Sequence, residues 1–133
     1  MELQELYPNR NILSFRETPT VNGQEALDLQ KKTDGTVTIL GEVATAPVAR
    51  WLVQLSQVAS KFTVFTHHAK TTNHLVASLR NALLQEGGFT NEVIAEEQVV
   101  DTVNFDIHMA KSVDGHRYIE RITEIIPYED AEF

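Results

Sequence analysis

The sequence predicts an α/β protein in which parallel strands joined by helices come first and an antiparallel hairpin comes last. Two short β-branched runs, 37–40 and 62–66, are each followed by an apolar pattern of helical period. From residue 104 the pattern changes to alternation around Asp114-Gly115, which is typical of a hairpin turn. We therefore expect one mixed sheet within a single domain that spans residues 1–133.

The first third of the chain is divided by turn residues. Residues 1–7 form a short acidic lead-in, and residues 8–11 form a turn. Alternation predicts a strand at 11–16, and a modest apolar pattern predicts a helix at 26–32 that ends near Gly35.

Three amphipathic helices are predicted in the middle of the chain. Apolar residues recur at helical spacing within 48–59, 75–84 and 93–100. Their starts are Pro47 for the first, Thr72 or Asn73 for the second, and Thr90 or Asn91 for the third. Gly87-Gly88 ends the second helix.

Composition and charge limit the class of protein. The content of hydrophobic residues is 42%, and the formal net charge is −8, which argues against a general nucleic-acid binder because phosphate binding requires a clustered basic surface. The chain has no cysteine, so it has no disulfide or thiolate zinc site. No apolar run approaches 18 residues, so we expect a cytoplasmic protein without a membrane span.

Two of the predicted strands end in residues that carry chemistry. The first delivers Gly41-Glu42, and the second delivers His67-His68. If the strands are parallel, a right-handed crossover brings both ends to one edge of the sheet, where Glu42 and His68 face one ligand. A carboxylate and an imidazole there suit a phosphate-transfer site.

Other interpretations of these residues remain open. Glu42 also suits a helix cap or an arginine partner, and His67 suits a packed position at a strand end. A zinc site would draw on Glu42, His67, His68 and His74, although adjacent strand residues point to opposite faces. His108 and His116 are expected to be ordinary surface residues of the hairpin.

Five segments occur in an order and spacing that is more specific than any one of them. They are 11–16, Ile39-Leu40-Gly41-Glu42-Val43, 62–69, and the closing pair 75–84 and 117–125. Together they resemble the type II/IV secretion ATPases, including CpaF-like members, which are hexameric motors of pili, secretion and conjugation. The resemblance implies a partial RecA-like P-loop NTPase core, with the second and third segments corresponding to the Walker B and histidine-box regions.

The resemblance also implies roles for individual residues. Glu42 matches the Walker B glutamate that aligns the attacking water near Mg²⁺ without binding the ion directly. His68 matches the histidine near the γ-phosphate of ATP. Arg16 is a looser match to phosphate-sensing arginines, and Gly41 belongs to the nucleotide site. The implied partners are other motor subunits in a homo-hexamer and inner-membrane platform proteins, at the cytoplasmic face of the membrane and with no direct nucleic-acid contact.

The sequence departs from this family in one decisive respect. It contains no G-x-x-x-x-G-K-[ST] phosphate loop, so we expect the chain alone to bind ATP and Mg²⁺ poorly. The acidic box is missing, Ala44 replaces a common arginine, and Ala59-Ser60 replaces a Gly-His pair. Three hypotheses follow: the C-terminal portion of a motor ATPase, a non-catalytic assembly or docking module of such a machine, or an unrelated small α/β binding protein. A sheet that lacks its central strand also predicts self-association or partner binding.

Overall fold

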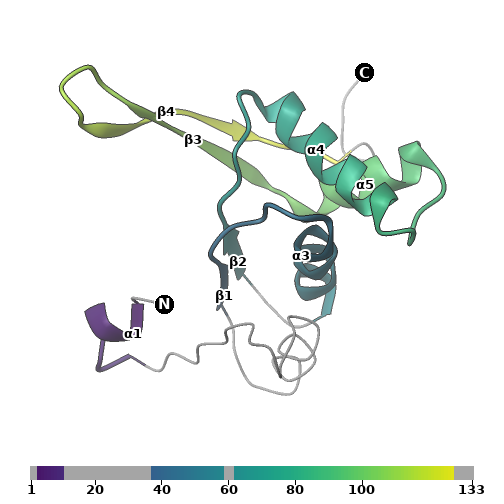
Figure 1. Cartoon of the computed structure of the whole chain (residues 1–133), viewed down its shortest axis with the longest axis horizontal. Helices are drawn as coiled ribbons and strands as arrows, with labels where there is room; N and C mark the ends of the chain where they lie inside the picture. Colours follow the sequence, from purple (N-terminus) through teal and green to yellow (C-terminus); the bar gives the residue numbers. More distant parts are fainter. Residues whose placement is uncertain (1–2, 11–36, 59–61, 128–133) are drawn as a thin grey trace.

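The computed structural model describes residues 3–10, 37–58 and 62–127. Its elements follow the predicted order of strand–helix units and a closing hairpin (Figure 1). They are α1 (Leu3–Leu6), β1 (Val37–Leu40), α3 (Ala46–Val58), β2 (Phe62–Phe65), α4 (Thr72–Gln85), α5 (Glu92–Thr102), β3 (Phe105–Lys111) and β4 (Arg117–Glu124). The predicted strand at 11–16 and the predicted helix at 26–32 lie outside the described residues.

The first sheet is the parallel pair β1–β2, as the sequence predicted. Val37 is in register with Phe62, and Leu40 is in register with Phe65. The connection runs through α3, which lies on one side of the pair in Figure 1. Leu40 and Phe65 pack against the hydrophobic core, whereas the other face is open. That open face carries Val37, Ile39, Phe62 and Val64.

The core lies between β1–β2 and the three longer helices. Leu52 on α3, Leu83 on α4 and Val99 on α5 are at most 2% exposed. Each helix contributes one apolar stripe, so the helices bury those stripes against one another and against the inner face of the pair. The full cluster is Val43, Ala49, Leu52, Val53, Leu75, Leu79, Leu83, Ala95, Val99 and Val103.

Local chemistry sets the ends of α4 and α5. The Thr71 side chain accepts a hydrogen bond from the backbone N–H of His74, so Thr71 caps α4, one residue before the predicted position. Asn91 caps α5 by accepting from Val93 and Ile94, which confirms one of the two predicted caps. Gly87 follows α4 with φ of 77°, a conformation that glycine adopts without the steric cost that a side chain brings.

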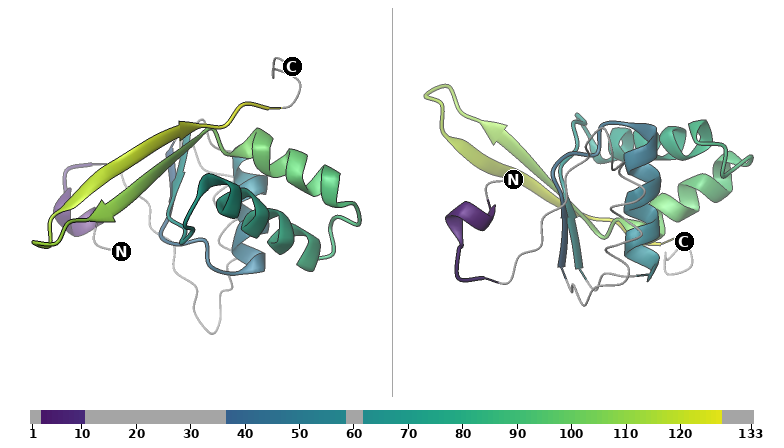
Figure 2. Two further views of the ribbon diagram at one scale, coloured as in Figure 1. Left: turned by 90° about the horizontal axis from the view of Figure 1, so that it is seen from above. Right: turned by 60° about the horizontal axis from the view of Figure 1, so that its bottom comes forward.

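The second sheet is the antiparallel hairpin β3–β4, which extends away from α4 and α5 in both views of Figure 2. Gly115 has φ of 90° in the predicted turn. A β-bulge shifts the register between His108 and Met109, so that Glu120 is the extra residue opposite them. The bulge places Ile119 and Ile122 on one face, whereas simple alternation puts them on opposite faces.

Two further observations differ from the sequence-based expectations. Residues 3–6 form one turn of helix, α1, in the stretch that the sequence analysis describes only as an acidic lead-in. In the described part of the chain, β1–β2 and β3–β4 form two separate sheets instead of one mixed sheet. Across these same residues, no helix combines the length and apolar character needed to cross a membrane.

Leu83→Ala tests the core. Leu83 is 1% exposed, so truncation leaves a cavity among α3, α4 and α5. We expect the free energy of unfolding to fall by about 3 kcal/mol in urea denaturation followed by circular dichroism. Val93→Ala is the matched control, because Val93 is 62% exposed on α5, and its effect should stay within about 0.5 kcal/mol. Equal losses for the two variants would contradict this packing.

The hairpin turn predicts a measurable pH dependence. The Ser112 hydroxyl and then the His116 ring hold the pKa of Asp114 below its ordinary value of 3.8, because each stabilises the carboxylate by hydrogen bonding. Since the pKa is lower in the folded chain, the carboxylate stabilises the turn above pH 3.8, and this contribution is lost as the pH falls below that value. Ser112→Ala should raise the pKa of Asp114 in an NMR titration, whereas Ser78→Ala on α4 should leave it unchanged.

Candidate functional site

The candidate site lies where β1 and β2 both end. Because the strands are parallel, their carboxyl ends meet at one edge, and the segments that follow them are joined by hydrogen bonds. The Val43 N–H donates to the Thr66 carbonyl over 2.8 Å, and the Thr66 hydroxyl donates to the Gly41 carbonyl over 2.5 Å. These bonds fix the positions of the residues between and beside them, Glu42 and His67-His68.

Glu42 and His68 meet at this edge. The Nε2 atom of His68 lies 3.2 Å from Oε1 of Glu42. Both side chains are accessible, with 95% of the His68 side chain and 51% of the Glu42 side chain exposed. Such an exposed contact contributes little to stability, because water solvates both groups and competes with the pair. The two groups are therefore positioned together while remaining open to a ligand.

His67 has a different environment from its neighbour. Its Nδ1–H donates to the Val43 carbonyl, and its Nε2 lies 3.1 Å from the Ser78 hydroxyl on α4. With Nδ1 carrying the proton, Nε2 accepts from Ser78. The ring thus connects the segment after β1, the segment after β2 and α4. The packed position considered for His67 in the sequence fits this geometry, because both ring nitrogens are engaged.

The hairpin also supports the segment that follows His68. The Arg121 guanidinium donates to the Lys70 carbonyl over 3.0 Å, and the Thr72 hydroxyl donates to the Asp106 carboxylate over 2.7 Å. Both contacts come from β3 and β4, which are more than 30 residues away along the chain. The conformation of the His68 segment therefore depends on the second sheet as well as the first.

A hollow of about 400 Å³ lies beside the site. It is bounded by the segment after β1, the start of α3 and one side of α4, with His67 and Ser78 among its polar residues. The other lining residues include Ala44, Ala46 and Ala49, so its walls are made largely of small side chains. Its volume falls within the range of small-molecule sites, although Glu42 and His68 do not line it.

The other residues predicted for the site do not all lie at this edge. Among the described residues, and apart from its two chain neighbours, Gly41 has no atom within 4 Å of the position where a Cβ would stand, so its backbone can be approached closely. His74 lies at the start of α4, and Arg16 lies outside the described residues. Within the described ranges, no three His, Cys, Asp or Glu residues gather as a metal site, so the geometry does not support the zinc alternative.

Some residues that shape the site gave no signal in the sequence. Ser78 is 11 residues from His67 and lies on a helix whose apolar pattern says nothing of its polar face. The sequence pattern places Thr66 only in a strand and Arg121 only in a hairpin, and it assigns neither residue to the site. His108, expected to be an ordinary surface residue, is only 25% exposed in its side chain, and its Nε2 lies 3.3 Å from a Glu120 oxygen.

Comparison of the chain with protein-family models and with curated proteins finds no match. The chemistry of this edge is therefore inferred from the positions and contacts of Glu42, His67 and His68.

Substitution of the two adjacent histidines should change the stability of the fold to different extents. His67→Ala removes two hydrogen bonds and leaves the Val43 carbonyl and Ser78 hydroxyl without them, so we expect a loss of about 2 kcal/mol in unfolding free energy. His68→Ala removes one exposed contact and should change stability by less than about 0.5 kcal/mol. Urea denaturation measures both values. A larger loss for His68→Ala than for His67→Ala would contradict these assignments.

Proposed function

We propose that the chain contributes the C-terminal part of a nucleotide-hydrolysing site in a motor ATPase of the type II/IV secretion class. The observation that carries the proposal is the Glu42–His68 contact at the carboxyl edge of two adjacent parallel strands. Ligands bind at this edge in open α/β sheets, and the sequence around both residues resembles the Walker B and histidine-box segments of that class. The RecA-like assignment of the fold is part of the same proposal.

The proposed roles follow from the chemistry of the two side chains. Glu42 accepts a hydrogen bond from a water molecule and orients it for attack on the γ-phosphorus. As the water oxygen bonds to phosphorus, the bond to the β–γ bridging oxygen breaks, and the water proton passes to the Glu42 carboxylate or to solvent. His68, when protonated, donates to the developing phosphate charge. Gly41 and Arg16 are the proposed nucleotide contacts.

In this proposal, the site also needs a phosphate cradle and Mg²⁺, which the residues named above do not supply. A phosphate cradle is absent from the sequence, so another polypeptide segment supplies it. Mg²⁺, when bound, neutralises the charge of the β- and γ-phosphates. A single carboxylate fits an indirect role for Glu42, through water, better than direct binding of the ion. The proposed setting is a homo-hexamer at the cytoplasmic face of the inner membrane, in contact with platform proteins.

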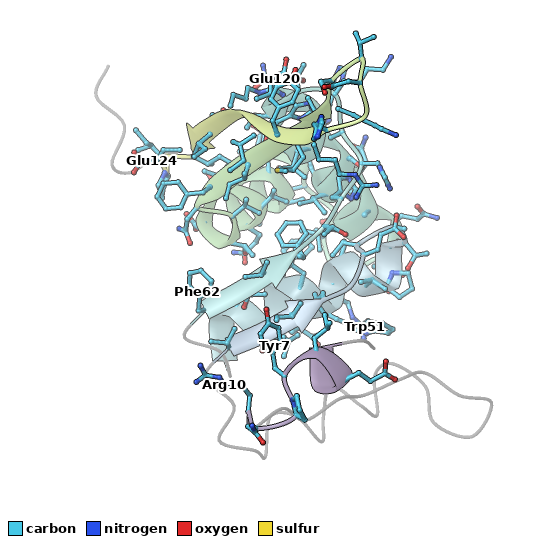
Figure 3. All side chains as sticks on the ribbon, turned by 90° about the vertical axis from the view of Figure 1, so that its left-hand side faces the viewer. Tyr7, Arg10, Trp51, Phe62, Glu120 and Glu124 are labelled. Carbon is cyan, nitrogen blue, oxygen red and sulfur yellow. The ribbon has the colours of Figure 1, made fainter. Side chains whose placement is uncertain are left out.

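A second candidate function is a docking module without catalysis. The open face of β1–β2 favours it, because Val37, Ile39, Phe62 and Val64 remain between 42% and 62% exposed (Figure 3, where Phe62 marks the start of β2). Parallel sheets are ordinarily covered on both faces, so this one is suited to a partner. The two candidates differ at Glu42 and His68, which only the catalytic function requires.

Titration with Mg·ATP tests the proposed site. We expect NMR resonances of His68 and Gly41 to shift with a dissociation constant on the order of 1 mM, because the edge is present but the phosphate cradle is not. His116, at the far hairpin turn, is the internal control and should not shift. Micromolar binding by this chain alone would contradict the missing cradle. Equal behaviour of His68 and His116 would favour the docking module.

Glu42→Gln then separates binding from hydrolysis. In a motor reconstituted with a chain that carries a phosphate loop, this substitution should abolish ATP turnover and leave nucleotide affinity within about threefold, because the amide cannot accept a proton. Glu97→Gln, on the exposed side of α5, is the matched control and should leave turnover unchanged. Undiminished turnover by Glu42→Gln would exclude the assigned role.

A further inference from the structure

The hairpin has an apolar face that nothing in the described part of the chain covers. We call it the outer strip. Its apolar members are each between 53% and 62% exposed. They are Phe105, Ile107, Met109, Ile119 and Ile122. Because the hairpin extends away from the helices in Figures 1 and 2, the strip is accessible along its length.

A strand pair packed on a core turns its apolar face inward, whereas this hairpin turns its polar face toward the body. The inner face carries Asp106 and Arg121, which bond to Thr72 and Lys70 on the body. Polar contacts thus attach the hairpin, and the apolar side is left open. A two-stranded sheet with one open apolar face is marginally stable in water, which favours burial of that face against a partner.

Charged residues end the outer strip, with opposite sign at its two ends. At the turn, Lys111 is in register with Arg117, and at the base, Phe105 is in register with Glu124. Arg117 and Glu124 have no ion-pair partner among the described residues. Along a strand, seven residues span about 20 Å, so these two side chains cannot reach each other within one hairpin.

We propose that the outer strip binds the outer strip of a second copy of this chain, with the two hairpins antiparallel and related by a twofold axis at the level of His108 and Arg121. This operation places β3 over β3 and β4 over β4, with the turn of each hairpin over the base of the other. The strand pairing within each hairpin then determines which residues of the two copies face each other. Ile107 faces Met109 of the second copy, and Ile122 faces Ile119.

The same registry matches the charges. Glu124 faces Arg117 of the second copy, and Phe105 faces Lys111, whose aliphatic stem and ammonium group suit an aromatic ring. A twofold axis generates each of these contacts twice. An axis parallel to the strands would instead place β3 over β4, so that Arg117 would face Lys111 of the second copy and Glu124 would face Phe105. The like charges at the turn then oppose that arrangement, whereas the antiparallel one pairs opposite charges.

The surface is large enough for a specific contact. Five apolar side chains with about 100 Å² exposed on each make about 500 Å² per copy, so two copies bury about 1,000 Å², which is where specific interfaces begin. The charged ends add to this area. A lipid surface fits less well, because Glu124 would meet anionic headgroups. The inference does not depend on the proposed ATPase function, since neither Glu42 nor His68 takes part.

Sedimentation velocity over a concentration series of the full chain tests the proposal. We expect a monomer–dimer equilibrium, and Ile122→Lys should weaken the dimer about a hundredfold by placing a charge in the centre of the contact. Val93→Lys is the matched control, because Val93 on α5 is 62% exposed, as Ile122 is, and should leave dimerisation unchanged. Circular dichroism verifies that each variant is folded.

Charge reversal tests the registry. Arg117→Glu or Glu124→Arg alone should weaken the dimer about tenfold, because both cross-copy pairs become repulsive. The chain with both substitutions should dimerise within about threefold of the original, since the pairs are restored with opposite polarity. A monomer at all concentrations up to about 100 µM would overturn the proposal. Dimers that Ile122→Lys weakens no more than Val93→Lys does, or double reversal without restoration, would overturn it equally.

Discussion

The parallel pairing of β1 with β2 is the constraint on which the rest of the site depends. Glu42 and His68 are 26 positions apart in the chain, and neither side chain is held by burial. They meet because α3 returns the chain in the direction that keeps both strands parallel, which brings both carboxyl ends to one edge. The backbone bond from Val43 to Thr66 then joins the two segments beyond the strand ends.

The core and the hairpin support this edge in different ways. Apolar contacts among α3, α4 and α5 hold the body together, and Arg80 adds a polar link by pairing with both Glu92 and Glu96 across α4 and α5. The hairpin is attached by hydrogen bonds to the segment between β2 and α4. The segment that carries His68 is therefore anchored on two sides, while the imidazole itself projects into solvent.

Sequence patterns predicted the elements of the described chain well, because each element depends on local periodicity. The runs 37–40 and 62–66, the helical stripes and the Asp114-Gly115 turn all appear where the pattern placed them. The approach of Glu42 to His68 also followed, given parallel strands. The cap of α4 was predicted one or two residues late, since Thr71, Thr72 and Asn73 all have suitable side chains and only backbone geometry selects among them.

What the sequence did not predict depends on contacts between distant elements. The bond from His67 to Ser78 requires knowledge of how α4 crosses the sheet edge, and the bond from Arg121 to Lys70 requires the position of the hairpin. The separation into two sheets is likewise a matter of tertiary placement. Alternation along β4 alone does not predict the bulge, because the bulge is defined by the pairing of β4 with β3.

That bulge makes the length of β4 more important than the identity of its extra residue. Glu120 lies outside the regular count of pairs, so replacing it costs one surface contact with His108. Inserting one further residue beside it would instead turn Ile119 toward the body and bring Tyr118 outward, because side-chain direction reverses with each added position. Position 120 should therefore tolerate many substitutions, whereas β4 should tolerate few single-residue insertions beside it.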